Sequence, residues 1–495
     1  MTVKEDEEKV SFEEALNEAG FGLYSYLISS LAGLMVISFV CIAYSNTMIT
    51  PTSACELETT SGQRGLLASM PVVGMILGSL ASSYVSDVIG RRLTLLICLT
   101  TSAIVNALSS ISVNWIMLMI LQLVATFLSA GQYPMSMTLL SESVPMIKRN
   151  MVVLVVGSIF LLSQGIMSAL AIPIIPLTFS YEIPVLGIYW NSWRTLLLVY
   201  SAPSIVSAFW LFFMCESPKF VFAKGREEEA VNILKKIHRL NHLGSKTEFT
   251  VKSIVAETSS ETTSSKSAKD QILPLFKSPL LKNTIILTTL FLFQQVLAFI
   301  VWLPTIANTF IESLNTGEIS NLTLCHILNI DIDAPPDPDA VPCSLNVPSL
   351  LVVLSVSALL SVTNIFIAMI IRRVGHRNII IFVTALCGVC GILVNLVPNA
   401  IGSAVMFIAF LLGAVTYGLY TAMAVALYPT YLRTLAIALT MTGNRLGTFA
   451  AVQILNVLIE SNCEVGFYVF SALLASSAIV AAFLPDDRIL QKENQ

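Results

Sequence analysis

Arg445 is the residue of this sequence whose chemistry most needs a partner. It lies well inside an apolar run that begins near Thr434 and is expected over 434–459. In a helix its distance from Thr434 corresponds to about 17 Å, roughly the middle of a bilayer. An Arg at that depth costs at least about 2.5–3.5 kcal/mol, so it should face a cavity or a partner. No Asp or Glu lies well inside any apolar run, which favours an anionic solute or chloride as its counter-charge. Alternatively, Arg445 donates to helix carbonyls and to amides such as Gln294 or Gln164.

Amide and aromatic side chains in other apolar runs could line the same pocket, because they offer hydrogen bonds and stacking surfaces to a small solute. Each of them can equally be a packing residue, since buried amides often hold membrane helices together. With Arg445, the candidate substrate-binding residues are Asn444, Gln132, Tyr133, Gln164, Gln294, Gln295, Trp302, Tyr417 and Tyr420.

Charged residues bracket the short turns between several apolar runs. Opposite charges at adjacent helix ends can hold two helix bundles together on one side. Exposed ion pairs contribute only about 0–1 kcal/mol each, so such a latch needs several of them. The basic members are also explained without a latch if they merely retain the turns in the cytoplasm. The candidate cytoplasmic gate residues are Asp87, Gly90, Arg91, Arg92, Glu142, Arg149, Glu216 and Arg433.

Twelve apolar runs must position these residues. The 495-residue chain is 55% hydrophobic and only 12% charged, which does not fit a soluble protein. Since a membrane helix needs about 20 apolar residues, the sequence predicts an all-α membrane protein of twelve transmembrane helices. The expected spans are 23–44, 65–86, 93–112, 115–140, 151–173, 195–215, 284–308, 349–371, 379–397, 400–428, 434–459 and 465–484.

Basic residues set the expected orientation. Of the 27 Lys and Arg residues, 24 fall in one of the two alternating sets of loops. Short cytoplasmic loops retain basic residues, so both termini are predicted to be cytoplasmic. The resulting division is a cytoplasmic N-terminal segment 1–22, a six-helix bundle 23–215, a cytoplasmic linker 216–283, a second six-helix bundle 284–485 and a cytoplasmic tail 486–495.

The segments outside the spans carry their own signals. Ser11 and Glu14 have the spacing of a capping box that opens a short helix before the first span. The linker begins with an amphipathic helix over 227–240 and continues as a Ser/Thr-rich tract over 244–270.

Several function classes find no support. No nucleophile–base pair or phosphate-cradling loop is present, so we do not expect an enzyme. The net charge is −4, without a basic face interleaved with aromatics, so no nucleic-acid partner is expected. The four histidines show no metal-ligand clustering, so we expect neither a metal nor a cofactor.

The two halves of the chain repeat one pattern. Gly90 and Gly375 are each followed by basic residues after an apolar run, and their positions differ by 285 (375 − 90). Pro145 and Pro429 lie in the turns after the fourth and tenth runs, and their positions differ by 284 (429 − 145). A nearly constant offset indicates a duplicated six-helix unit, and hence two pseudo-symmetric six-helix bundles.

On these motifs the chain resembles the major facilitator superfamily, through the turn at 87–92 above all. Within it the chain is similar to the branch of synaptic vesicle glycoprotein 2 and the organic ion transporters, on the segments 11–16, 191–194, 216–220, 225–230, 301–304 and 427–433. The resemblance implies alternating access. It also implies that the gate residues close the cytoplasmic side of an outward-facing state. The segment 444–447 is similar to organic anion transporters in which an Arg faces the pocket.

The chain departs from the family pattern at three places. Arg372 stands where the first half has Asp87, and Ala426 where it has Glu142, so we expect asymmetric closure on the cytoplasmic side. The first span lacks the carboxylate common in proton-driven relatives. Gln294-Gln295 are similar to the paired glutamines of sugar transporters, but the following residues do not continue that pattern.

The predicted outer loop 309–348 contains two candidate modification sites. Asn321 begins an N-glycosylation sequence. Cys325 and Cys343 lie in this one loop, so we expect them to form a disulfide. Acidic residues between prolines in the same loop are weak evidence for calcium.

Taken together, the residues predict a transporter of a small organic solute, anionic or zwitterionic. Uniport or exchange is favoured over proton symport, because no titratable group lies between the two faces. We expect a monomer in the lipid bilayer of the plasma membrane or of an intracellular vesicle. The alternative is a transporter-like receptor or vesicle component without flux of its own.

Overall fold

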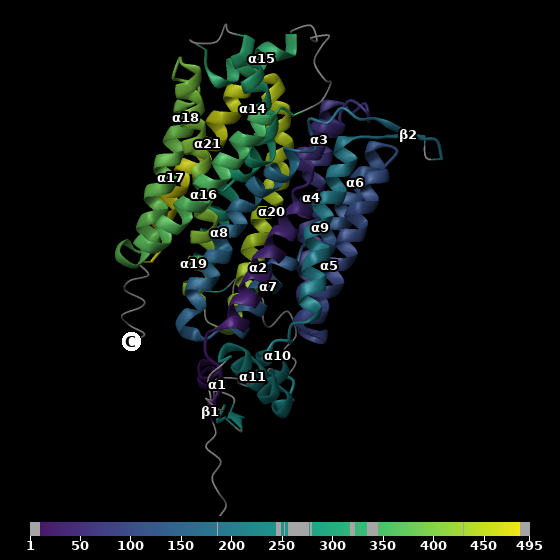
Figure 1. Cartoon of the computed structure of the whole chain (residues 1–495). Coiled ribbons are helices and arrows are strands. Elements are labelled where there is room, and N and C mark those ends of the chain that lie inside the picture. The colour runs from purple at the N-terminus through teal and green to yellow at the C-terminus, as the bar shows by residue number, and fades with distance from the viewer. Residues whose placement is uncertain are drawn as a thin grey trace, which may run out of the picture.

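The structure is a computed structural model. It describes residues 10–185, 187–243, 249–251, 253–255, 277, 280–316, 322–333, 345–428 and 430–485. Long helices run side by side through the body of the molecule (Figure 1). This is the all-α fold that the apolar runs predict.

The first half of the chain builds its bundle from six spans, two of them divided. The elements are α2 (Leu23–Ala43), α3 (Asn46–Ser53), α4 (Ser61–Ile89), α5 (Arg91–Leu108), η1 (Ser109–Ile111), α6 (Trp115–Ser129), α7 (Gln132–Ser143), α8 (Met146–Ala171) and α9 (Ser192–Phe212). Between α8 and α9, β2 (Tyr181–Ile183) and β3 (Ile188–Trp190) form an antiparallel hairpin.

The second half repeats the arrangement. Its elements are α13 (Leu280–Phe293), α14 (Val296–Thr316), α15 (Leu324–Asp333), α16 (Val347–Val374), α17 (His376–Leu393), α18 (Ala400–Leu411), η3 (Leu412–Val415), α19 (Thr416–Leu427), α20 (Thr430–Ser461) and α21 (Cys463–Ala481).

Eleven helices or joined helix pairs within the described residues are long and apolar enough to cross a membrane. The remaining long helix, α20, has 32 residues and carries Asn444, Arg445, Gln453 and Asn456. At 1.5 Å per residue it reaches about 48 Å, more than a bilayer core needs. Its amides and its Arg bond to the other half of the chain, so a helix with a polar face is stable here because that face meets protein.

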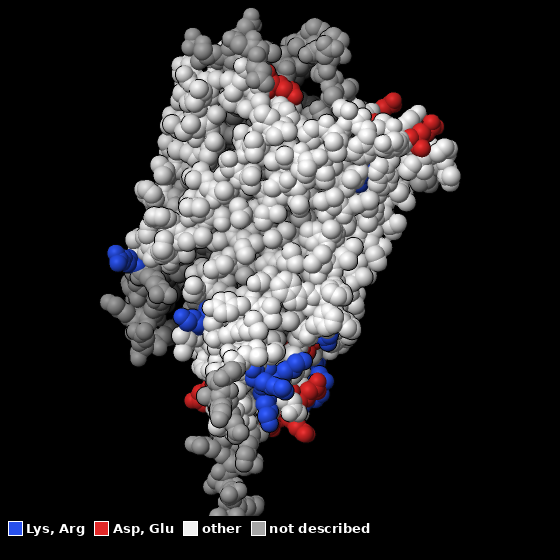
Figure 2. Space-filling model, in the orientation of Figure 1, with Lys and Arg blue, Asp and Glu red and all other residues white. Residues whose placement is uncertain are grey.

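The two ends of the molecule differ in charge. One end carries α1 (Phe12–Glu18), α10 (Pro218–Ala223) and α11 (Glu227–Asn241), whereas α15 and β2 lie at the opposite end (Figure 1). Blue Lys and Arg side chains gather around the first of these ends, and the opposite end shows acidic ones (Figure 2). We call the end with α10 and α11 the basic end and the other the far end.

The N-terminal segment and the linker pack together at the basic end. Ser11 and Glu14 form the predicted capping box, since each side chain meets the other's backbone N–H. β1 (Val10–Ser11) pairs in parallel with β4 (Ile254–Val255). The predicted linker helix is α11, and Asn241 near its end donates to the carbonyls of Ala19 and Gly20. Most of the tract 244–270 lies outside the described residues.

In each half, the first and the fourth span are divided into two helices. The breaks fall between α2 and α3, between α6 and α7, between α13 and α14, and at η3 between α18 and α19. Irregular backbone at membrane depth is tolerated only where protein or a cavity covers it. The four breaks therefore lie toward the interior of the bundles.

The duplication is visible in the turn at the basic end of each half. Gly90 has φ 112° and ψ 158°, and Gly375 has φ 85° and ψ 152°. In the first half Arg92 donates to the carbonyl of Phe212 at 2.5 Å, and in the second Arg377 donates to the carbonyl of Ala482 at 2.5 Å. In both halves, then, an Arg just after the turn satisfies a carbonyl at the end of the last helix of its bundle.

Apolar packing joins the two halves toward the far end. One core cluster contains Phe39 and Ile49 of the first half together with Phe299 and Phe410 of the second. Toward the basic end there are two separate clusters, one of residues from the N-terminal segment, the first half and the linker, and the other of second-half residues. Among the described residues, the apolar cores of the two bundles are thus joined toward the far end and separate toward the basic end.

The disulfide prediction is wrong. Cys325 pairs with Cys463, and their Cα atoms are 5.5 Å apart. Cys325 sits on α15, which packs against α21 near Cys463, and both residues are buried. The spacing along one loop suggested Cys343, but folding places the start of α21 under α15. Cys343 lies outside the described residues, and Cys55 is also disulfide-bonded.

Candidate functional site

Arg445 crosses the seam between the two halves. It lies at the centre of α20, and its guanidinium donates to the carbonyl of Met75 at 2.8 Å and to the hydroxyl of Ser79 at 2.5 Å. Both acceptors are on α4, near the middle of that helix. The expected contact with a helix carbonyl is present and comes from the opposite bundle, and the second acceptor is the hydroxyl of Ser79 instead of the amides of Gln294 or Gln164.

Three tyrosines surround the same level of the seam, each beside a helix break. Tyr44 directly follows α2, Tyr133 is the second residue of α7, and Tyr417 is the second residue of α19. The phenols of Tyr44 and Tyr417 lie within electrostatic range of the Arg445 guanidinium, and the phenol of Tyr133 lies within the same range of that of Tyr417. We call Tyr44, Tyr133, Tyr417 and Arg445 the midplane cluster. Two of its members come from each half of the chain.

The charge of Arg445 is only partly compensated. Two hydrogen bonds to a charged donor contribute about 1.5–3 kcal/mol each, which offsets the roughly 2.5–3.5 kcal/mol of placing an Arg at this depth. No carboxylate lies within ion-pair distance of it among the described residues. The helix is therefore stable without a bound solute, and a positive charge remains for an anion.

Aromatic contacts orient the phenols of this cluster. The ring of Tyr133 lies 5.0 Å from Phe160 and 6.2 Å from Phe39, both on neighbouring helices. Tyr417 meets the ring of Phe291 edge-on at 5.6 Å. These contacts fix the rings, so the phenol groups are held in place before any solute arrives.

Three of the predicted binding amides have an oxygen that accepts no hydrogen bond within the described residues. They are Asn444 (Oδ1), Gln295 (Oε1) and Gln132 (Oε1), and each side chain is more than nine-tenths buried. Gln295 donates to Leu292, and Gly447 of α20 lies against it, where an added Cβ would be 2.6 Å from its amide nitrogen. Gln164 is also buried and donates to Thr47 at 3.2 Å.

Four of the predicted binding residues hold helices together. Gln132 donates to Ser102 and to the carbonyl of Cys98. Gln294 bonds Gly413 and Thr416 across the C-terminal bundle. Trp302 donates to Val452 at 3.4 Å, and Tyr420 is fully buried in the core of the second half. The geometry of these four side chains is that of packing residues.

Tyr44 was missed from the sequence. It stands at the end of an apolar run and begins the polar sequence Tyr44-Ser45-Asn46, at the break between α2 and α3. That polar interruption of an apolar run was the available signal. A broken helix in the middle of the membrane marks binding sites in many transporters.

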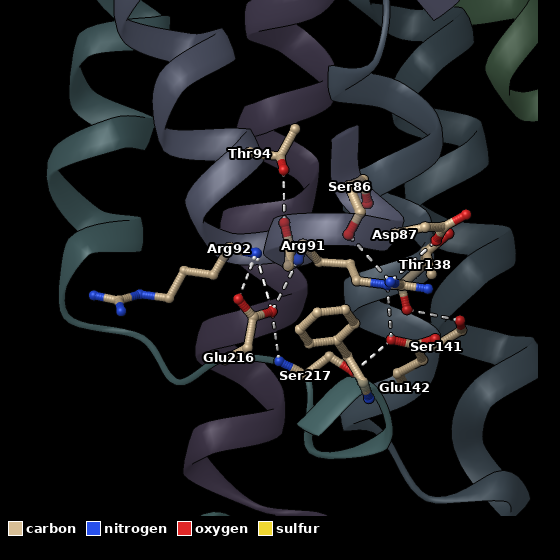
Figure 3. Close-up of polar contacts among 12 residues, drawn as sticks. Ser86, Asp87, Arg91, Arg92, Thr94, Thr138, Ser141, Glu142, Glu216 and Ser217 are labelled. Carbon is tan, nitrogen blue, oxygen red and sulfur yellow. Dashed lines mark hydrogen bonds and ion pairs between the residues drawn. The ribbon is translucent and has the colours of Figure 1, made fainter. Parts of the chain in front are cut away.

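Most of the predicted gate residues form one cluster at the basic end (Figure 3). Glu216 accepts hydrogen bonds from the backbone N–H groups of Arg91 and Arg92 at 3.1 and 3.0 Å, which caps the start of α5. The guanidinium of Arg91 lies 3.1 Å from Asp87 and 3.6 Å from Glu142. Burial of the Arg91 and Glu142 side chains strengthens this pair relative to a fully exposed one.

The same cluster ties the linker to the first bundle. Ser217 caps α10 and donates to the carboxylate of Glu142. The guanidinium of Arg91 also lies over the ring of Phe220, 4.9 Å from its centre. At Gly90 an added Cβ would be 2.6 Å from an oxygen of Glu216, so the turn needs glycine for space as well as for its positive φ.

Two gate residues lie apart from this cluster. Arg149 pairs with Glu13 of α1 at 2.7 Å, and Glu13 also lies 3.7 Å from Lys219. Arg433 lies on α20, and its side chain is outside the described part of the structure. The ion pairs described at the basic end all lie within the N-terminal segment, the first half and the linker.

Two further features remain. Asn321, the predicted glycosylation site, is outside the described residues. A shallow hollow on the exposed face of α17 is lined by Asn378, Ile381, Phe382, Ala385, Leu386 and Val389. Its lining is almost entirely apolar and includes none of the predicted binding residues.

The paired bundles, the broken inner helices and the charged turns define a polytopic membrane protein of the transporter class with the major facilitator fold. The chain belongs to the Major Facilitator Superfamily, whose family model matches residues 31–452. The family is one of transporters rather than enzymes, as the sequence predicted.

Curated relatives confirm the resemblance to the synaptic vesicle branch. Human synaptic vesicle glycoprotein 2B is 27% identical over 241 residues, 48% of this chain and 35% of that protein. Synaptic vesicle 2-related protein from Xenopus laevis is 28% identical over 225 residues, 46% of this chain and 38% of that protein. The match thus spans little more than a third of each relative's length.

Solved structures confirm the fold. The xylose transporter XylE from E. coli, in a partially occluded inward open conformation, matches with a TM-score of 0.65 at 16% identity, over 94% of this chain and all of that one. A mutant of the nucleoside transporter NupG matches with a TM-score of 0.55 at 12% identity, over 92% of this chain and 98% of that one. At these identities the likeness concerns the fold.

Proposed function

We propose that this protein carries a small organic anion or zwitterion across a membrane by alternating access. The observation that carries the proposal is Arg445. It stands at the middle of the membrane, on the seam between the bundles, and no carboxylate neutralises it among the described residues. A cation held at that place attracts an anionic group strongly, because the low dielectric of the surroundings weakens screening.

The midplane cluster would bind the solute from both halves. The guanidinium takes the anionic group, and the phenols of Tyr44, Tyr133 and Tyr417 offer hydrogen bonds and aromatic faces. The oxygens of Asn444 and Gln295 can accept from an ammonium or hydroxyl group of the same solute. Because the ligands come from both bundles, binding and release are coupled to the relative position of the bundles.

Contacts along the seam support this movement. On α20, Asn456 donates to Ser61 at 2.9 Å and Gln453 to Ser69 at 2.7 Å, both toward the far end. A second contact between the halves runs along α8 and α16. Near the middle of these helices, Ser361 donates to the carbonyl of Ser158 at 2.9 Å. With the cores separated at the basic end, these bonds fit a conformation closed at the far end.

The basic end is then the cytoplasmic end, because it carries the Lys and Arg residues that short cytoplasmic loops retain. On this assignment both termini are cytoplasmic and the conformation faces inward. The gate residues of the first half would close this end in the outward-facing state. The location fits either the plasma membrane or an intracellular vesicle.

Coupling to protons has no evident carrier. The membrane-spanning part of α2 contains no Asp or Glu, and the carboxylates described near spans, such as Glu142, lie at helix ends. A proton-driven cycle needs a titratable group between the two faces. We therefore favour uniport or exchange.

The test is uptake of labelled organic anions by purified protein in proteoliposomes. Arg445→Gln should abolish uptake, and Arg445→Lys should retain a fraction of it because the charge remains. Ser79→Ala is the matched control, since it removes a hydrogen bond to Arg445 and leaves the cation in place. Normal anion uptake by Arg445→Gln with an unchanged melting temperature would remove the binding role of Arg445.

A receptor or vesicle component without flux remains the second candidate. It is favoured by Arg372 and Ala426, which replace acids of the first-half pattern, and by the similarity to vesicle glycoproteins. The two candidates separate in one assay. Anions that shift the melting temperature of the wild type but are neither taken up nor exchanged would support the receptor.

A further inference from the structure

The hairpin between α8 and α9 leaves the bundle sideways at the far end. β2 and β3 pair Tyr181 with Trp190 and Ile183 with Ile188. Figure 1 shows β2 projecting laterally beyond α6, at the level where the helices of the first half end. In the sequence 173–190 the only charged residue is Glu182.

Its projecting side chains are apolar or aromatic. Val185 at the tip is 92% exposed and Tyr181 is 69% exposed. Tyr189 and Leu177 are about half exposed, at 51% and 50%. A two-stranded hairpin is only marginally stable in water, and one with these side chains uncovered would lose further stability by exposing apolar surface.

The base of the hairpin, by contrast, is fixed to the bundle. Trp190 donates to the hydroxyl of Thr195 at 3.0 Å, and Ile188 is 3% exposed. The next residue, Asn191, donates to Glu56, which also accepts from Arg194 at 2.6 Å. The hairpin is therefore held at a set height and direction instead of swinging freely.

The start of α6, at the same end of the molecule, also exposes apolar side chains. On α6, Ile116 and Ile120 are exposed apolar residues in the first turns of a membrane-spanning helix. Exposed apolar side chains at this end of the spans lie where hydrocarbon meets headgroups. Tyr and Trp are enriched at that depth, because their rings pack on acyl chains while their polar groups stay hydrated.

We propose that the hairpin is an interfacial anchor that rests in the headgroup region of the far-end leaflet. The partner is the lipid of the same bilayer, and the inference does not depend on transport. The anchor fixes the height of α9 in the membrane through the bonds at its base. The bundle of the first half is thereby held at a set depth in the membrane.

A nitroxide at Val185→Cys tests the anchor in lipid nanodiscs. The free cysteines Cys41, Cys98, Cys215, Cys387 and Cys390 are replaced by Ala to direct labelling. Gly62→Cys is the matched control, because it lies at the same end, is exposed, and meets no neighbour within 4 Å. Collision rates with oxygen, which partitions into lipid, and with a water-soluble nickel chelate give the depth of each label.

The expected ratio of oxygen to chelate accessibility is several-fold higher at 185 than at 62. Equal ratios would place the hairpin in water and overturn the proposal. Low accessibility to both reagents, with broadening between labels of neighbouring copies, would show self-association and overturn it as well. Circular dichroism and the melting temperature of the labelled protein verify that the variant is folded.

Discussion

The turns at the basic end of the two bundles share their backbone and differ in their charges. Gly90 and Gly375 both have positive φ, and the Arg two residues later caps the last helix of its own bundle in each half. In the first half three acids surround the turn, namely Asp87, Glu142 and Glu216. In the second half the first two positions hold Arg372 and Ala426.

The difference separates two roles that one motif combines. The glycine and the capping Arg are retained in both halves, so the duplicated backbone needs them for folding. Asp87 and Glu142 have no acidic counterpart in the second half, and in the first half they bind Arg91 and the linker, so they serve something that only that half does. The third acid of the first half, Glu216, has an acidic counterpart by position. Glu216 lies four residues after Phe212, and Asp486 lies four residues after Ala482. Asp486 lies outside the described residues.

The largest expected effect is at the glycines. Gly90→Ala places a Cβ in a backbone region that costs of order 1–3 kcal/mol for other residues, and it also displaces Glu216, which would lie 2.6 Å away. Gly375→Ala brings the same kind of conformational cost, since Gly375 also has a positive φ of 85°. We expect Gly90→Ala to lower the melting temperature in detergent more than Gly375→Ala does.

The control for this pair is Gly62→Ala, where the new Cβ meets no atom within 4 Å. It should leave the melting temperature nearly unchanged. Equal losses at 90 and 375 would mean that Glu216 moves aside at no cost, and the acids of the first turn would then contribute little to its stability.

The capping arginines give the next effect. Arg92 donates to the carbonyls of Leu211 and Phe212, whereas the described bond of Arg377 goes to Ala482 alone. A cation at a helix C-terminus contributes about 0.3–1 kcal/mol. We expect Arg92→Gln to destabilise the protein more than Arg377→Gln, with both effects below that of Gly90→Ala. Thermal unfolding followed by tryptophan fluorescence measures this, and a larger loss for Arg377→Gln would reverse the comparison.

Local and periodic features of the fold could be predicted from the sequence. Apolar length identified the spans, and the spacing of Ser11 and Glu14 identified a capping box that the structure confirms. These signals lie within one element, so the neighbouring elements do not alter them. The duplication was predictable for a similar reason, since the constant offset between Gly90 and Gly375 and between Pro145 and Pro429 requires no knowledge of packing.

Features that depend on contacts between distant elements were harder to predict from the sequence. The partner of Cys325 depends on where α15 comes to rest, which no spacing reveals. Gln132 and Gln295 are both glutamines inside apolar runs, yet the amide of Gln132 donates to Ser102 on another helix, whereas the amide of Gln295 donates to Leu292 three residues earlier. The role of such a glutamine depends on the helix face that it occupies and on the element that packs against that face. Arg445 was the exception, because a charge at membrane depth demands a partner whatever surrounds it.

The smallest effect sharpens the comparison by testing whether closure is asymmetric. The side chain of Asp87 is 72% exposed, so its pair with Arg91 contributes only about 0–1 kcal/mol. Such an energy changes a conformational population by up to about fivefold. In the proposed gate Asp87 helps to close the basic end in the outward-facing state, so Asp87→Asn should raise the fraction of molecules open at that end, while Arg433→Gln should change it less. Distances between spin labels on the two bundles at the basic end report these populations. Equal shifts from the two variants would show that Arg433 finds an acid by another route, and the first-half cluster would lose its special role in closure.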